Sequence, residues 1–214
     1  MSNHDDHDHD HDHDHPHETL PDGTEHLTYY QMMEVALREL LVEKGVFSAA
    51  EVRRQVEDMD ARTPARGAKM VARAWVDPAY KARMLVDGSA AAEEVGLEVG
   101  PLKLVVVENT PQVHNLIVCT LCSCYPRMPL GLPPDWYKSR PYRSRAVSEP
   151  RKVLAEFGTH VSDDIDVRVH DSTADMRYLV LPLRPEGTAG WPEEKLAELA
   201  TRDSMVGVAF ARAP

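Results

Sequence analysis

The sequence predicts an α+β fold in which a helical N-terminal arm precedes an α/β sheet domain. This domain carries a cysteine-claw metal loop at residues 119–124 (the claw). Three observations support this. Residues 28–98 show apolar side chains at helical spacing behind capping residues, residues 99–214 contain short β-branched runs between turns, and all three cysteines fall within six residues. We therefore expect a disordered tail over 1–27, a helical arm over 28–98, and a metal-binding catalytic domain over 99–214.

Composition narrows the classes of function. The net charge is −11, and residues 1–18 hold six Asp and one Glu but no Lys or Arg. Because nucleic-acid binding usually needs a basic face, we expect no nucleic-acid partner. No stretch approaches the ~18 consecutive apolar residues of a membrane span, and the polar start resembles neither a signal nor a transit peptide. Three cysteines in 214 residues fit a reducing compartment, so we expect a cytoplasmic protein.

Residues 1–17 alternate His and Asp and contain almost nothing apolar, so they cannot form a core. Three interpretations stay open. The segment is a solvated disordered tail, a loose metal-collecting tail, or a cloning tag. The metal-collecting interpretation follows because neutral imidazole and carboxylate both bind divalent ions.

Capping residues mark the helical region. Thr28 can cap a first helix that Gly45 can end, and Ser48 with Glu51 forms a capping box for a second. The apolar stripes of these helices predict core or subunit contacts and no catalytic role. Further helices are predicted over 65–76, from Pro78 to 87–88, and over 89–95.

Residues after Gly100 favour strands. The predicted strands over 165–169 and 176–183 flank the turn-forming pair Asp171-Ser172, which predicts a hairpin. Six prolines between 126 and 150 predict an irregular loop with short helical turns. Strands are predicted over 102–107, 115–118, 165–169, 176–183 and 206–210, with further helices over 151–157 and from Pro192.

The cysteine cluster is the most informative feature of the chain. Cys119, Cys122 and Cys124 could bind zinc, but zinc sites usually take four ligands from two separated pairs. No second pair exists, and His114 is one candidate for a fourth ligand. Three ordinary buried thiols are the other simple interpretation.

The spacing around Ser123 favours a different metal. The Cys122 sulfur and the Ser123 amide nitrogen can close a six-membered chelate ring, and the Cys124 nitrogen and sulfur close a five-membered one. Cys119 can add a third sulfur on the axis, which leaves one position of an octahedron open. Deprotonated amides are strong donors, so the set suits Co(III) or Fe(III) rather than zinc.

The segment Val118-Cys-Thr-Leu-Cys-Ser-Cys-Tyr-Pro126 resembles the metal-binding signature of the nitrile hydratase α-subunit. Other stretches are also similar to that family, and the resemblance covers roughly residues 28–208. They include Lys69-Met-Val-Ala-Arg-Ala-Trp-Val-Asp-Pro78, Leu130-Gly-Leu-Pro-Pro134, Tyr142-Arg-Ser-Arg145 and Arg184-Pro-Glu-Gly-Thr188.

The resemblance implies a site and a reaction. It implies sulfur ligation by Cys119, Cys122 and Cys124, nitrogen ligation by Ser123 and Cys124, and oxidation of Cys122 to sulfinic and Cys124 to sulfenic acid. Thr120 marks a cobalt enzyme in the family, so one Co(III) per chain is expected and Fe(III) is less favoured. The implied reaction hydrates a small nitrile to its amide, with Cys124 oxygen a candidate nucleophile. A β-subunit and an activator protein for cobalt loading are the implied partners.

Arg127 departs from the pattern, because cobalt nitrile hydratases typically have Trp there. Thiocyanate hydrolase, a related cobalt enzyme, has Arg at that position, and its metal subunit resembles this chain in its His-Asp-rich start. A guanidinium beside the claw could attract an anion such as thiocyanate. Alternatively, Arg127 points to solvent or to the β-subunit, and the Leu130-Gly-Leu-Pro-Pro134 stretch matches nitrile hydratase better.

A cobalt- or nickel-trafficking protein is the alternative from another functional class. It would have to release its ion, whereas a Co(III) claw holds it. His114, Asp171 and Arg177 are weaker candidates for residues around the metal or the substrate pocket. The size of the nitrile does not follow from this chain, because a β-subunit would supply much of the pocket.

Overall fold

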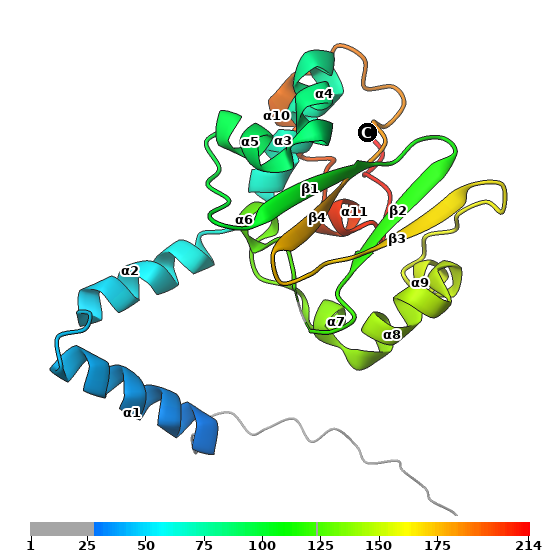
Figure 1. Ribbon diagram of the computed structural model, residues 1–214. Helices are drawn as coiled ribbons and strands as arrows, with labels where there is room; N and C mark the ends of the chain where they lie inside the picture. The colour runs from blue at the N-terminus through cyan, green and yellow to red at the C-terminus, as the bar shows by residue number, and fades with distance from the viewer. Residues whose placement is uncertain (1–27, 123) are drawn as a thin grey trace, which may run out of the picture. The chain divides into compact units, whose positions relative to one another are not determined.

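The computed structural model describes residues 28–122 and 124–214, so the predicted tail and Ser123 lie outside the described residues (Figure 1). Contacts divide the chain into two compact units between Glu51 and Val52. This division falls inside helix α2 (Ala49–Asp60), and the boundary at 98/99 stays a prediction. Within the described chain, no helix is long and apolar enough to cross a membrane.

Both predicted helix caps are present at the start of the described chain, and the cap at Thr28 is also a capping box. Helix α1 (Tyr29–Glu43) begins behind Thr28, whose Oγ1 accepts from the Gln31 N–H at 3.4 Å while its own N–H donates to Gln31 Oε1 at 2.7 Å. Ser48 and Glu51 exchange the same two bonds at 3.2 and 2.7 Å before α2. Helix α1 buries none of its side chains within the described chain.

The next three helices also form where the sequence predicts them. They are α3 (Ala65–Val76), α4 (Pro78–Val86) and α5 (Gly88–Glu94), and they follow one another closely because Asp77 and Asp87 cap α4 and α5. Helices α4 and α5 pack on strand β1 (Lys103–Glu108). A Cβ at Gly88 would lie 2.6 Å from the Leu104 carbonyl oxygen, so only glycine allows α5 to lie this close.

The strands form two parallel pairs, which corrects the predicted hairpin. Strand β1 pairs with β4 (Met176–Leu181), and β2 (Val113–Val118) pairs with β3 (Asp166–Asp171). Although β3 and β4 are consecutive, each takes a partner far away in sequence (Figure 1). Parallel strands that are covered on both faces have continuous apolar runs, and β1 and β4 have such runs. The turn residues between β3 and β4 fit a hairpin equally well, so local pattern could not decide the pairing.

The proline-rich segment consists of short helices, as expected, but the helix over residues 140–148 is longer than a single turn. Helices α6 (Arg127–Leu130) and α7 (Asp135–Lys138) precede α8 (Arg140–Ser148), and α9 (Pro150–Glu156) follows. Prolines occupy first-turn positions of α8 and α9, where their missing N–H costs nothing. Aromatic rings pack this segment, with the Trp136 and Tyr142 centroids 4.9 Å apart.

The predicted final strand at 206–210 is wrong, because helix α11 (Arg202–Val206), which comes after α10 (Glu193–Ala197), ends at residue 206 and residues 207–210 form a turn and irregular backbone. Thr201 and Ser204 form a capping box that starts α11, and Gly207 ends it with a φ of 92°. A Cβ at Gly207 would lie 2.0 Å from the Asn115 carbonyl oxygen of β2. Helix α11 therefore lies between the two strand pairs (Figure 1). The combination of helices with these two strand pairs confirms the predicted α+β fold class.

Candidate metal centre

The three cysteine sulfurs come together at the carboxyl end of β2. Cys119 follows the last residue of β2 and is buried, Cys122 is exposed and Cys124 is half-buried. The Cys122 sulfur lies 3.3 Å from that of Cys119 and 3.0 Å from that of Cys124. Their sulfur atoms lie within 4.8 Å of one another, and no described His, Asp or Glu joins them to make a larger group of metal ligands.

The sulfur spacing distinguishes between coordination geometries. With metal–sulfur bonds of about 2.3 Å, two sulfurs lie about 3.3 Å apart at a right angle and about 3.8 Å apart at the tetrahedral angle. The 3.0 and 3.3 Å separations therefore fit neighbouring corners of a square or an octahedron. Three such donors suit a metal with right-angled ligands, whereas structural zinc needs a tetrahedral set of four.

The crowding of the thiols affects the ionisation of Cys124. Burial raises the pKa of Cys124 to about 12, and hydrogen bonds with Cys122 and Cys119 act in the same direction. The Arg177 guanidinium opposes this rise. A thiolate is the form that binds metal, so a bound cation would be needed to keep the Cys124 sulfur charged at neutral pH.

The predicted residues Thr120 and Asp171 meet and hold the start of the loop. Asp171, the last residue of β3, accepts from the Thr120 N–H at 2.9 Å with one carboxylate oxygen and from the Thr120 hydroxyl at 2.5 Å with the other. The β2–β3 register pairs Val118 with Asp171, so the strand ladder itself places this carboxylate beside the loop. Asp171 thus fixes the first peptide after Cys119.

Two further contacts hold the other end of the loop. Tyr137 on α7 donates its hydroxyl to the Cys124 carbonyl oxygen at 2.9 Å, and Arg143 on α8 donates to the Cys122 carbonyl oxygen at 3.1 Å. The sequence analysis did not select either residue for the site. Arg143 lies within a stretch that resembles the family, and that was the one signal available for it.

Arg127 and Arg177 lie at a cavity beside the sulfurs. This cavity has a volume of about 640 Å³, and Cys122 and Cys124 form part of its wall. Arg127 enters it from the start of α6, Arg177 from β4, and Arg62 from the segment before α3. Among the described residues, its lining includes three arginines and no Asp or Glu. The cavity next to the claw is therefore cationic and otherwise largely apolar.

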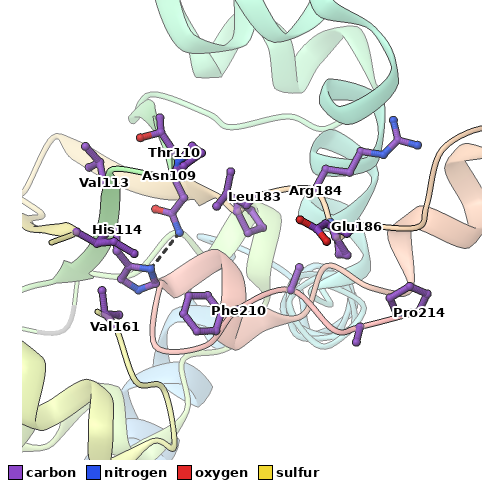
Figure 2. A pocket seen from close by; sticks show the side chains of 16 residues that line it. Asn109, Thr110, Val113, His114, Val161, Leu183, Arg184, Glu186, Phe210 and Pro214 are labelled. Carbon is purple, nitrogen blue, oxygen red and sulfur yellow. Dashed lines mark hydrogen bonds between the residues drawn. The ribbon is translucent and has the colours of Figure 1, made fainter. Parts of the chain in front are cut away.

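His114 lies away from the sulfurs. It is the second residue of β2, about 16 Å from Cys119 along the strand. Its Nε2–H donates to the Gly207 carbonyl oxygen at 2.7 Å, and its Nδ1 lies 3.4 Å from the Asn109 amide nitrogen. Burial lowers the pKa of His114, and the bond to Gly207 opposes this effect. Figure 2 shows the ring beside Phe210 at a separate cavity of about 330 Å³.

Comparison with known proteins establishes the relationship that the sequence suggested. The profile of the family described as "Nitrile hydratase, alpha chain" matches residues 28–209. The chain belongs to this family. The nitrile hydratase family match spans all described residues except 210–214, so it includes the cysteine loop and both strand pairs.

Named nitrile hydratases and a thiocyanate hydrolase are among the similar sequences. A nitrile hydratase subunit alpha of Rhodococcus sp is 51% identical, and the alignment covers 84% of this chain and 92% of the relative. The low-molecular weight cobalt-containing subunit alpha of Rhodococcus rhodochrous is 48% identical over 92% of this chain and 94% of its own. The thiocyanate hydrolase subunit gamma of Thiobacillus thioparus is 45% identical, and the alignment covers 88% of this chain and 82% of the relative.

Solved structures of both enzymes share the fold. A recombinant thiocyanate hydrolase comprising partially modified cobalt centres has a TM-score of 0.81 at 42% identity, and covers 86% of this chain and 91% of its own. A double mutant of the Fe-type nitrile hydratase from Comamonas testosteroni Ni1 has a TM-score of 0.80 at 44% identity with the same coverage. The nitrile hydratase α-chain fold thus occurs with cobalt and with iron, so the metal needs its own argument.

Proposed function

We propose that this chain is the metal-bearing α-subunit of a nitrile hydratase, which converts R–C≡N and water into R–C(=O)NH₂. The observation that carries the proposal is the cluster of three sulfurs at right-angle spacing in a member of this family. Cys119, Cys122 and Cys124 would hold one Co(III) by sulfur, and Ser123 and Cys124 would hold it by backbone nitrogen. The bound ion supplies a Lewis acid with one open position for the reaction.

The surroundings of the claw support nitrogen donors. The Cys122 carbonyl belongs to the peptide whose nitrogen is that of Ser123. A peptide nitrogen that binds a metal without its proton shares negative charge with the carbonyl oxygen, and Arg143 donates a charged hydrogen bond to that oxygen. Thr120 and the cobalt-containing relative favour cobalt over iron, and the sulfur spacing disfavours zinc.

Unequal exposure of the cysteines supports unequal oxidation. Cys119 is 1% exposed, whereas Cys122 is exposed and Cys124 half-buried. Oxidation follows thiolate character and access to the oxidant, so Cys122 and Cys124 are the cysteines that can be oxidised. We propose that dioxygen, as the external oxidant, converts Cys122 to the sulfinic acid and Cys124 to the sulfenic acid, whose oxygen would act as the nucleophile toward the nitrile.

Exposed apolar side chains on α1 support a partner. Tyr30 is 82% exposed and Leu37 57%, and apolar side chains recur along the helix although α1 buries none of them. A helix with this pattern normally packs against something. We propose that a nitrile hydratase β-subunit covers α1 and the exposed claw, and that a small activator protein delivers cobalt.

Metal content provides the first test. The α-subunit purified with its partner from cobalt-fed cells should contain about one cobalt per chain and retain it during dialysis against a chelator, because Co(III) exchanges ligands slowly. Elemental analysis before and after dialysis measures this. Stoichiometric zinc without cobalt or iron would contradict the proposal. Cobalt that a chelator removes readily would favour the metal-trafficking alternative.

Thiocyanate is the second candidate substrate, and the cationic cavity beside the claw supports it. Arg127 and Arg177 line the wall near Cys122 and Cys124 without an ion pair to a described carboxylate, whereas Arg62 in the same wall is paired with Asp58. Guanidinium groups in such a wall attract small anions. A thiocyanate hydrolase subunit is also among the named relatives.

A comparison of two substrates tests this candidate. If the chain serves a nitrile hydratase, small neutral nitriles should be hydrated at least about ten times faster than thiocyanate, measured as kcat/KM. If Arg127 selects the anion, Arg127→Trp should lower kcat/KM for thiocyanate at least about tenfold and spare the nitriles. Arg140→Trp, at an exposed arginine outside the cavity lining, is the matched control and should change neither. Faster hydrolysis of thiocyanate by the wild type would reverse the order of the two candidates.

A further inference from the structure

The parallel pairing of β2 and β3 brings Ser172 next to Cys119. Val118 and Asp171 are the last register partners, and the Ser172 N–H donates to the Val118 carbonyl oxygen at 2.8 Å. Cys119 and Ser172 follow these partners on neighbouring strands about 4.8 Å apart. Side chains at matching positions of parallel strands project from the same face of the sheet. Cys119 is 1% exposed and Ser172 3%, so both project into protein.

The Ser172 hydroxyl is buried and has no hydrogen-bond partner among the described residues. Buried hydroxyls in folded proteins usually have one, so this group needs an acceptor. The alternative partner for it is the Tyr137 hydroxyl, with which the Ser172 side chain interacts and which itself donates to the Cys124 carbonyl oxygen.

The Cys119 sulfur changes as an acceptor with its chemical state. A neutral thiol is a weak acceptor, whereas a metal-bound thiolate carries negative charge and accepts hydrogen bonds well. The sulfur already accepts one bond, from the Cys122 N–H at 3.3 Å. A second donor from the neighbouring strand would fix the direction of the sulfur and reduce its electron donation to the metal.

We propose that Ser172 is a positioning residue that donates a hydrogen bond to the Cys119 sulfur in the metal-loaded protein. The inference rests on the proposed function, because it requires Cys119 to be a metal ligand. Ser172 and Asp171 then act as neighbours on one strand end, with Asp171 holding Thr120 and Ser172 holding Cys119.

The test uses the cobalt-loaded complex with its partner subunit. Ser172→Ala should lose cobalt to a chelator about tenfold faster than the wild type, and should shift the sulfur-to-cobalt charge-transfer absorption. Ser172→Thr keeps the hydroxyl and should behave like the wild type. Thr159→Val is the matched control, because it removes another buried hydroxyl, one that donates to the Val208 carbonyl oxygen at 2.7 Å far from the claw. It should leave both measurements unchanged.

Two results would overturn the proposal while leaving the function intact. One is a Ser172→Ala complex with the absorption and cobalt retention of the wild type. The other is an effect of Ser172→Ala that disappears in a Tyr137→Phe background, because the hydroxyl would then act on Tyr137 and not on the sulfur. A wild-type complex without cobalt would overturn the proposed function and this inference with it.

Discussion

Cys124→Ser should reduce nitrile hydration by roughly a thousandfold or more while the chain stays folded. The Cys124 sulfur lies 3.0 Å from that of Cys122 and would be both a ligand and the bearer of the nucleophilic oxygen. A serine hydroxyl binds a cobalt ion less well than a thiolate, and its oxygen cannot take the sulfenate role. Because Cys124 is half-buried in a surface loop, the thermal unfolding midpoint should change little.

Leu121→Ala is the matched control for this loss. Leu121 lies between the cysteines but is 90% exposed and offers no ligand atom. Its variant should retain activity if it binds the partner subunit normally. A Cys124→Ser enzyme that hydrates nitriles at the wild-type rate would show that the claw does not carry the reaction.

Gly207→Ala should have the largest effect on stability, lowering the free energy of unfolding by about 4 kcal/mol or more. The added Cβ would lie 2.0 Å from the Asn115 carbonyl oxygen, and the φ of 92° is unfavourable for alanine. Moving Gly207 away from β2 would also break the bond from His114 to the Gly207 carbonyl oxygen. Denaturant or thermal unfolding of the metal-loaded complex measures the change.

Gly158→Ala separates the two causes of this effect. Gly158 has a φ of 80°, but a Cβ there would meet nothing within 4 Å. Its variant therefore carries only the conformational cost, about 1–2 kcal/mol. If Gly207→Ala costs no more than Gly158→Ala, then the close packing of Gly207 on β2 does not contribute to stability.

Local signals determined how much of the fold could be predicted. The helix starts at Thr28, Ser48 and Pro78 were correct, because a cap depends on residues three or four positions apart. The strand pairing was wrong for the opposite reason. The choice between a β3–β4 hairpin and the two parallel pairs depends on partners far away in sequence, which local patterns do not show.

The same distinction applies to the claw. Its three sulfurs were found because they occupy one short segment. Asp171 was selected as a weak candidate, and its contact with Thr120 became visible only through the β2–β3 register. Tyr137 and Arg143 reach the loop from α7 and α8 through their side-chain ends, so only the folded chain reveals them.

The pairing of β2 with β3 also sets an order of events during synthesis. The ribosome makes the cysteines first and must then add the whole segment from α6 to α9 before β3 exists. At typical translation speeds this takes on the order of 2–10 s. During that interval Thr120 lacks the carboxylate of Asp171, and Val118 lacks its hydrogen bond from Ser172. If the chain binds cobalt as proposed, an ion captured by the nascent chain would meet an unsupported loop, so productive metal insertion would follow translation, when the strand pair has closed.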